Sequence, residues 1–199
     1  MENSNNVSIE WVNHASFIVR FKDFSLISDP WIFGSVFNNG WDLLSQSKFT
    51  LEDFASVKYI WFSHEHPDHF FPPVLKSIPN EIRENITVLF QETKDKRVVK
   101  FCKSLNFKIL ELEHQKEYTL DEDVKFSCIP NGVEDSLCLI KVGGKNILNL
   151  NDCVFFGEKD LKKLNIKDNI DVLLSIFGYA YRISNPDDKL KRIKLLTSC

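Results

Sequence analysis

The chain has 199 residues, of which 43% are hydrophobic and 27% charged, and its formal net charge is −3. This composition is typical of a globular protein with a proper core and excludes intrinsic disorder. Its 25 basic and 28 acidic side chains leave no excess of positive charge for a phosphate backbone. We therefore expect no nucleic acid partner.

The sequence also argues against a membrane or a secreted protein. No apolar run approaches the ~20 residues of a membrane span, and the N-terminal residues lack the basic and apolar regions of a secretion signal. The five cysteines are scattered without a Cys-x-x-Cys pair, which favours reduced thiols over a disulfide framework or a zinc ribbon. We predict a soluble cytoplasmic protein without a membrane partner, forming a single domain over residues 1–199.

Strands and helices alternate in the first part of the chain. Alternating apolar residues predict strands over 7–21 and 24–27, and glycine and asparagine predict a loop over 33–47. Thr50 followed by Asp53 predicts a short helix over 51–57. Beyond it we expect strands over 58–63, 86–90 and 108–112, separated by helices over 74–80 and 94–106. This order is typical of a parallel sheet with right-handed crossovers.

The second part of the chain reads mainly as hairpins. Strands are predicted over 118–120, 124–129, 137–142 and 146–150, with Gly143-Gly144 as a hairpin turn. A helix over 158–164 and a strand over 171–177 follow. No linker, repeat or low-complexity tract interrupts the pattern, so the whole chain reads as one α/β domain.

Three of the five histidines lie in residues 63–69 (SHEHPDH), directly after a buried strand. If the strand continues, His64 and His66 point to one side, and Pro67 then lets Asp68 and His69 fold back towards them. Imidazole and carboxylate donors suit zinc, iron or manganese. The end of a sheet strand is also where ligands gather in open α/β sheets. The alternative is a polar loop with solvated histidines.

The His-x-His-x-Asp-His motif after an apolar strand resembles the signature of the metallo-β-lactamase-fold superfamily. Residues 11–17 (WVNHASF) resemble the opening strand of its lactonase-like and N-acyl-phosphatidylethanolamine phospholipase D-like members. Residues 28–31 (SDPW), 40–41 (GW) and 149–153 (NLNDC) are similar to the metallo-hydrolase-like domain of CMP-N-acetylneuraminate hydroxylases and their bacterial relatives. The resemblance spans roughly residues 7–177 and implies a four-layer αβ/βα sandwich.

The resemblance also implies a metal centre and its chemistry. His64 and His66 would bind one ion, Asp68 and His69 a second, and Asp152 would bridge the two. The cofactor would be one or two divalent ions, zinc in the first place, with iron or manganese as alternatives. A metal-bound hydroxide would attack an ester, lactone or phosphodiester of a small-molecule substrate. Asp68 would double as ligand and catalytic proton acceptor.

The sequence departs from this pattern at two ligands. A third histidine is expected after the strand over 124–129, where this chain has the carboxylates Glu134 and Asp135. A last histidine is expected further on, yet none follows His114. The C-terminal end is therefore incomplete, or the protein functions without that ligand.

Two alternatives to a hydrolase remain open. One is a sialic-acid or nucleotide-sugar protein of the CMP-N-acetylneuraminate hydroxylase type. Those hydroxylases also carry a Rieske segment with Cys-x-His and Cys-x-x-His pairs, and this sequence has neither, which argues against an independent oxygenase. The other is a degenerate, non-catalytic metal- or ligand-binding module. The sequence names neither the substrate nor the oligomeric state.

Several isolated residues have weaker signals. We expect His14 to support a turn rather than bind a metal, and Asp29 either to orient a ligand histidine or to form a turn before Pro30. Glu134 or Asp135 either replaces the missing histidine or is solvated. The remaining expectations are an exposed His114, a buried Cys153, and an aromatic loop that covers a pocket or packs on the core, formed by Trp31, Phe33, Phe37 and Trp41.

Overall fold

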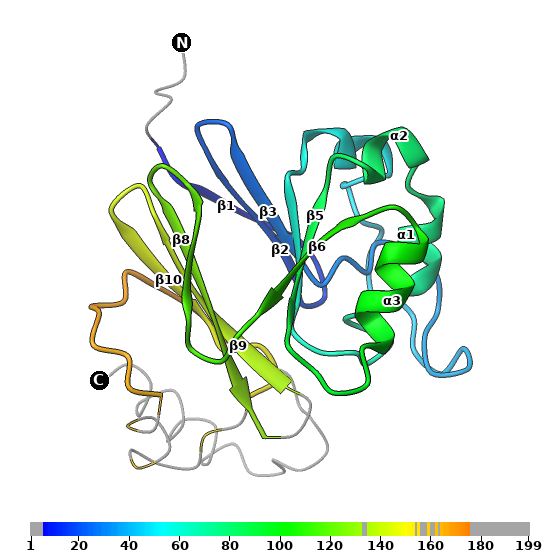
Figure 1. The fold of residues 1–199 in the computed structure, drawn as a ribbon. Helices are drawn as coiled ribbons and strands as arrows, with labels where there is room; N and C mark the ends of the chain where they lie inside the picture. The colour runs from blue at the N-terminus through cyan, green and yellow to red at the C-terminus, as the bar shows by residue number, and fades with distance from the viewer. Residues whose placement is uncertain are drawn as a thin grey trace.

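The computed structural model describes residues 6–132, 135–153, 155, 159, 162 and 164–175. They form two β-sheets packed face to face (Figure 1). In the first sheet the strands follow chain order: β1 (Ser8–Asn13), β2 (Ser16–Phe21), β3 (Phe24–Ser28), β4 (Tyr59–Phe62), β5 (Thr87–Gln91) and β6 (Lys108–Leu112). The second sheet has the order β11 (Val172–Leu174), β10 (Lys145–Asn149), β9 (Asp135–Val142), β8 (Val124–Asn131) and β7 (Glu117–Asp121).

The first sheet combines hairpin and crossover connections. Strands β1, β2 and β3 are antiparallel, whereas β3, β4, β5 and β6 run parallel. The crossovers carry α1 (Pro72–Ser77), α2 (Asn80–Arg83) and α3 (Arg97–Ser104), which cover the outer face of this sheet (Figure 1). The longest of them, α3, has 8 residues, and no helix in the described ranges has the length and hydrophobicity needed to cross a membrane. The predicted two-sheet fold is confirmed; the helix predicted over 158–164 lies mostly outside the described residues.

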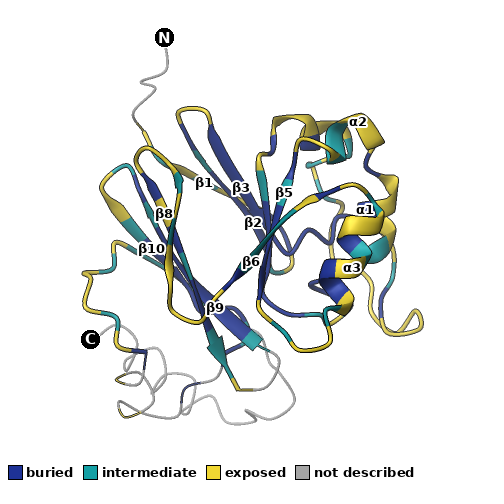
Figure 2. Cartoon of the chain, in the orientation of Figure 1, coloured by how far each residue is buried: buried dark blue, intermediate teal, exposed yellow. Residues whose placement is uncertain are grey.

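Period-two alternation places each strand between two apolar layers. In β4, Ile60 and Phe62 pack under the helices, while Trp61 points to the opposite face and packs between the sheets. In β9, Cys138 and Ile140 face the first sheet, and the flanking leucines face away from it. Figure 2 shows the resulting buried strands between exposed outer surfaces. The sandwich is thus held mainly by the core between the sheets.

Three predicted helix boundaries are wrong, each for a local reason. The segment over 51–57 is a 3-10 helix (Glu52–Ser56), and Thr50 donates its backbone N–H and hydroxyl to the Asp53 carboxylate instead of capping through its own oxygen. The helix over 74–80 breaks before Pro79, which has no N–H and favours an extended preceding residue. The helix over 94–106 begins only at Arg97, whose backbone N–H donates to the Asp95 carboxylate at 3.2 Å.

The β9–β10 hairpin confirms the predicted glycine turn. Gly143 and Gly144 have φ of +55° and +77°, a region that favours glycine. A Cβ on Gly143 would lie 2.6 Å from the Phe21 ring, whereas one on Gly144 would meet open space. The turn therefore also sets how closely β9–β10 approaches the first sheet.

Candidate metal centre

Five segments meet at one end of the sandwich. Because β3 and β4 are parallel, Asp29 and residues 63–69 leave the first sheet at the same edge. The β1–β2 turn adds His14, the start of β9 adds Asp135, and the chain after β10 adds Asp152. Ser136 donates its hydroxyl to the Ser63 carbonyl at 2.5 Å and so ties the second sheet to the histidine segment.

The first half of the site centres on His64. Strand β4 ends at Phe62, so the condition under which His64 and His66 would lie on one side of a continued strand is not met. Instead the chain turns, with the Phe70 N–H donating to the His66 carbonyl at 2.7 Å. The turn still brings the rings together: His64 Nε2 lies 2.9 Å from His66 Nδ1 and 3.7 Å from Asp135 Oδ1.

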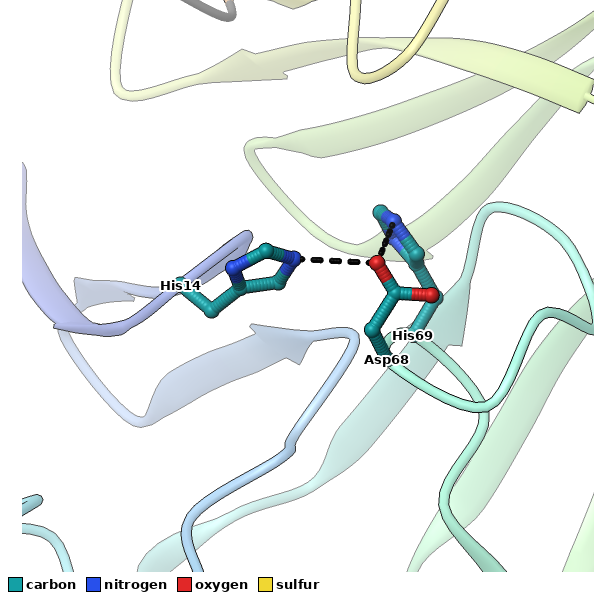
Figure 3. A group of neighbouring side chains, drawn as sticks. All are labelled: His14, Asp68 and His69. Carbon is teal, nitrogen blue, oxygen red and sulfur yellow. Dashed lines mark hydrogen bonds and ion pairs between the residues drawn. The ribbon is translucent and has the colours of Figure 1, made fainter. Parts of the chain in front are cut away.

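The second half centres on His69. Its Nε2 lies 3.3 Å from Asp152 Oδ2 and 3.5 Å from Asp68 Oδ2. His14 reaches the same Asp68 oxygen from the opposite side, with Nε2 at 3.1 Å (Figure 3). The ligand atoms of His14, Asp68 and His69 lie within 4.8 Å of one another, and so do those of His64, His69 and Asp152.

Asp29 orients His64 and His69 through hydrogen bonds, directly to His69 and through Ser63 to His64. Its side chain is fully buried, and its Oδ1 accepts the Ser63 backbone N–H at 2.8 Å. Its Oδ2 accepts the Ser63 hydroxyl at 2.8 Å, the Asn151 amide at 2.9 Å and His69 Nδ1–H at 3.1 Å. The Ser63 oxygen can then accept His64 Nδ1–H at 2.9 Å. This pattern turns the Nε2 atoms of both histidines towards the site, so Asp29 has the orienting role that was one of its two predicted alternatives.

Burial and charge shift the two central histidines in opposite directions. Burial, together with the nearby His69, lowers the pKa of His64 to about 4. Burial also disfavours a charged His69, but hydrogen bonds to Asp152 and Asp29 outweigh it and raise its pKa to about 10. Burial raises the pKa of Asp68 and of Asp152, but hydrogen bonds outweigh it. The bond from His14 lowers the pKa of Asp68, and the bond from His69 lowers that of Asp152. Without a metal, His69 therefore carries a proton between two carboxylates.

The residues fit a divalent metal on two observations. Asp68 Oδ1 is buried and has no hydrogen-bond partner, which costs about 1–3 kcal/mol unless something else engages it. Neighbouring donors lie 2.9–3.7 Å apart. Donors around a tetrahedral ion at about 2.1 Å would be about 3.4 Å apart. The array therefore has both the chemistry and the spacing of a metal site.

The structure gathers the five predicted ligands His64, His66, Asp68, His69 and Asp152 and adds two more. His14 lies among the donors rather than only supporting a turn, and Asp135 approaches His64 where the resemblance implied a histidine. Glu134 lies outside the described residues. The loop aromatics divide: Trp31 is buried with its ring 5.2 Å from His14, while the other three are exposed. As predicted, His114 is exposed and Cys153 is buried.

Two hollows flank the array. One, of about 540 Å³, lies between β1 and β11 at the open edges of the two sheets and includes His14 and Asp152 in its wall. The other, of about 660 Å³, lies beside His66 and is bordered by Phe70, Phe101 and the ion pair of Glu65 with Arg97. Both could admit a small molecule to the donor array.

Comparisons with known proteins agree with this architecture. The family model described as "Beta-lactamase superfamily domain" matches residues 8–197. The cytidine monophosphate-N-acetylneuraminic acid hydroxylase of Xenopus laevis is 28% identical over 158 residues, which cover 74% of this chain but only 26% of that protein. The chain thus spans about a quarter of the length of that curated relative.

Solved structures show the same fold at low identity. The isothiocyanate hydrolase from Delia radicum gut bacteria matches with a TM-score of 0.69 and 16% identity, covering 96% of this chain and 81% of that one. CmlA, a diiron beta-hydroxylase from Streptomyces venezuelae, matches with a TM-score of 0.64 and 17% identity, covering 84% and 34%. With its family model matched over nearly the full length and its two-sheet fold shared with these structures, the chain belongs to the beta-lactamase superfamily domain family.

Proposed function

We propose that this chain is a metal-dependent hydrolase of a small ester, lactone or phosphodiester. The observation that carries the proposal is the array of four imidazoles and three carboxylates at one end of the sandwich, in which the buried Asp68 Oδ1 has no other partner. The cleft beside it has the size of a small-molecule site. The described cysteines, which carry free thiols, support a cytoplasmic location.

Each half of the array would hold one ion. His64, His66 and Asp135 face one position, His14, Asp68 and His69 face the other, and Asp152 is the carboxylate between them. Both Nε2 atoms of His64 and His69 are presented as lone pairs by Ser63 and Asp29. A divalent ion supplies Lewis acidity there and lowers the pKa of water to about 7. The His69 ring can coordinate only one ion, through Nε2, because its Nδ1 is hydrogen-bonded to Asp29.

Asp68 has a second role in the proposal. Its Oδ2 is engaged by His14 and His69, whereas its Oδ1 is buried without a partner. The low pKa of this carboxyl keeps it ionised at neutral pH. Oδ1 is therefore the atom we assign as the acceptor of the proton that leaves the attacking water.

A second candidate is a role in hydroxylation, as in the curated relatives. Each of the two donor groups contains two histidines and one carboxylate, a set that also suits non-haem iron. The two similar hydroxylases, of which one is a diiron protein, support it. Zinc, manganese and iron therefore all belong in the test.

The test uses the purified chain, stripped with a chelator and reloaded with zinc, manganese or ferrous iron. Ion content is measured by elemental analysis, and turnover with p-nitrophenyl acetate, dihydrocoumarin and bis-p-nitrophenyl phosphate. We expect His66→Ala to lose bound metal, and Asp68→Asn to lose about 10²–10⁴-fold in turnover. His114→Ala, a matched change of an exposed histidine, should alter neither.

Three results decide between the candidates. Stoichiometric metal with hydrolysis that depends on Asp68 supports the hydrolase. Stoichiometric iron without hydrolysis, together with oxygen consumption in the presence of a reductant, supports the hydroxylase-type role instead. Far less than one ion per chain after reloading would leave a degenerate module as the remaining explanation.

A further inference from the structure

The hollow between β1 and β11, named here the edge cleft, has features that the metal array does not explain. Trp11 lies on β1 in its wall, and its side chain is 65% exposed. The indole is nevertheless fixed, because its Nε1–H donates to the His14 carbonyl at 3.1 Å. An indole held in place with most of its surface in solvent is a ready stacking surface beside the donor His14.

The edge cleft is an opening of the core between the sheets. Trp11 pairs with Phe17 across the β1–β2 hairpin, so both side chains share the face that looks towards the second sheet. Phe17 already belongs to the core between the sheets. Across the gap, Leu174 of β11 packs against the same core and is only half-buried. Apolar surface is thus exposed on both walls of one cleft, which is unfavourable in water and suits an apolar occupant.

The charge of the walls indicates what kind of occupant fits. Among the described residues that line the edge cleft, the ionisable ones are His14 and Asp152, both members of the donor array. By contrast, the hollow beside His66 contains Arg97, but Glu65 and Asp95 neutralise that guanidinium. The edge cleft therefore offers an aromatic stacking surface rather than a fixed cation for a phosphate or carboxylate.

We propose that the edge cleft binds the uncharged, ring-bearing part of the substrate, with Trp11 stacking on the ring. This inference rests on the proposed function and narrows its substrate class to a neutral ester or lactone with a flat ring. Trp11 acts as a specificity-determining residue and takes no part in holding the metal.

The test separates binding from turnover by using chelator-treated protein. Dihydrocoumarin, a neutral aromatic lactone, is compared with 3-(2-hydroxyphenyl)propanoate, its ring-opened anion, in ligand-observed NMR titrations. We expect the lactone to bind more tightly than the anion. Trp11→Ala should raise the lactone Kd about tenfold, and Trp11→Phe about threefold or less. Trp41→Ala is the matched control, since Trp41 is also exposed but lies outside the cleft wall.

The inference is overturned if the wild-type chain does not bind the lactone, if Trp11→Ala and Trp41→Ala bind it equally, or if the anion binds as tightly as the lactone. Turnover is then measured separately on metal-loaded protein. If binding depends on Trp11 but no metal-loaded form of the protein hydrolyses the lactone, the proposed hydrolase function is refuted and the edge cleft remains a ligand site.

Discussion

Replacing Asp29 by Asn tests how the site is held. The side chain keeps its shape but loses an acceptor, and the new amide must face groups that all donate. The Ser63 backbone N–H cannot reorient, so the amide oxygen should stay with it. The amide N–H then points at His69 Nδ1 and moves the ring proton to Nε2, the atom that faces the metal position.

The size of the effect follows from this change of tautomer. Loss of a partner that orients a ligand histidine costs about 10–100-fold in metal affinity, which corresponds to about 1.4–2.7 kcal/mol. The free energy of unfolding is affected separately, because the Asp29 carboxylate accepts hydrogen bonds from several buried donors. Each such charge-assisted bond that is lost costs about 1.5–3 kcal/mol. The variant should therefore fold with a lowered melting temperature and bind metal weakly.

Competition with a chromophoric chelator measures the affinity, and circular dichroism checks that the variant is folded. Asp123→Asn is the matched control, because Asp123 is exposed and pairs only with Lys22 among the contacts described. A folded Asp29→Asn protein whose metal affinity stays within about twofold of wild type would refute the orienting role of this carboxylate.

Three further predictions concern stability. Phe126→Ala empties the centre of the core between the sheets and should cost about 3–5 kcal/mol, or about 6–20 °C in melting temperature; a loss below about 1 kcal/mol would contradict that core. Gly143→Ala should cost about 1–2 kcal/mol more than Gly144→Ala in urea unfolding, because both positions have positive φ but only the first also meets a ring. Without metal, thermal stability should rise with pH from about 4 to 6.5, since burial has lowered the pKa of His64, and fall from 6.5 to about 10, since carboxylates have raised that of His69. His69→Gln should abolish the decline at high pH, and an unchanged decline would show that another group causes it.

The sequence predicted those features of the fold that depend on neighbours along the chain. Alternating apolar residues located β1, and the compact β-prone run 59–62 (YIWF) located β4, because each signal lies within one short segment. The strand ends were harder, since the turn after Phe62 depends on backbone hydrogen bonds to His66 rather than on side-chain pattern. Helix starts failed for the same reason, as with the Asp95 side chain before Arg97.

Of the site residues, those within one short segment were found from the sequence itself and Asp152 from the family resemblance, whereas His14 and Asp135 were not assigned as ligands. His14 and Asp68 are 54 positions apart in the sequence. Their 3.1 Å contact forms because the β1–β2 turn and the segment after β4 lie at the same end of the strands of the first sheet. The sequence indicated His14 through its position directly after a strand. A histidine in an ordinary turn would have the same position, so this signal could not identify a ligand. Asp135 was likewise one of two carboxylates in a loop, and only the β8–β9 hairpin places it near His64.

Asp135 also changes what the array can hold. Coordinated imidazoles are neutral, so the carboxylates of Asp68, Asp135 and Asp152 supply all the negative charge that offsets two divalent ions. A histidine in place of Asp135 would leave the loaded site one unit more positive. A carboxylate is also a harder ligand than imidazole, which favours manganese and iron more than zinc. The preference for zinc came from the family resemblance, whereas the donors of residues 63–69 by themselves suit zinc, iron or manganese. With carboxylates contributed by β9 and by the chain after β10, the intrinsic advantage of zinc over iron narrows, so the metal acquired in the cell depends on supply as much as on the site.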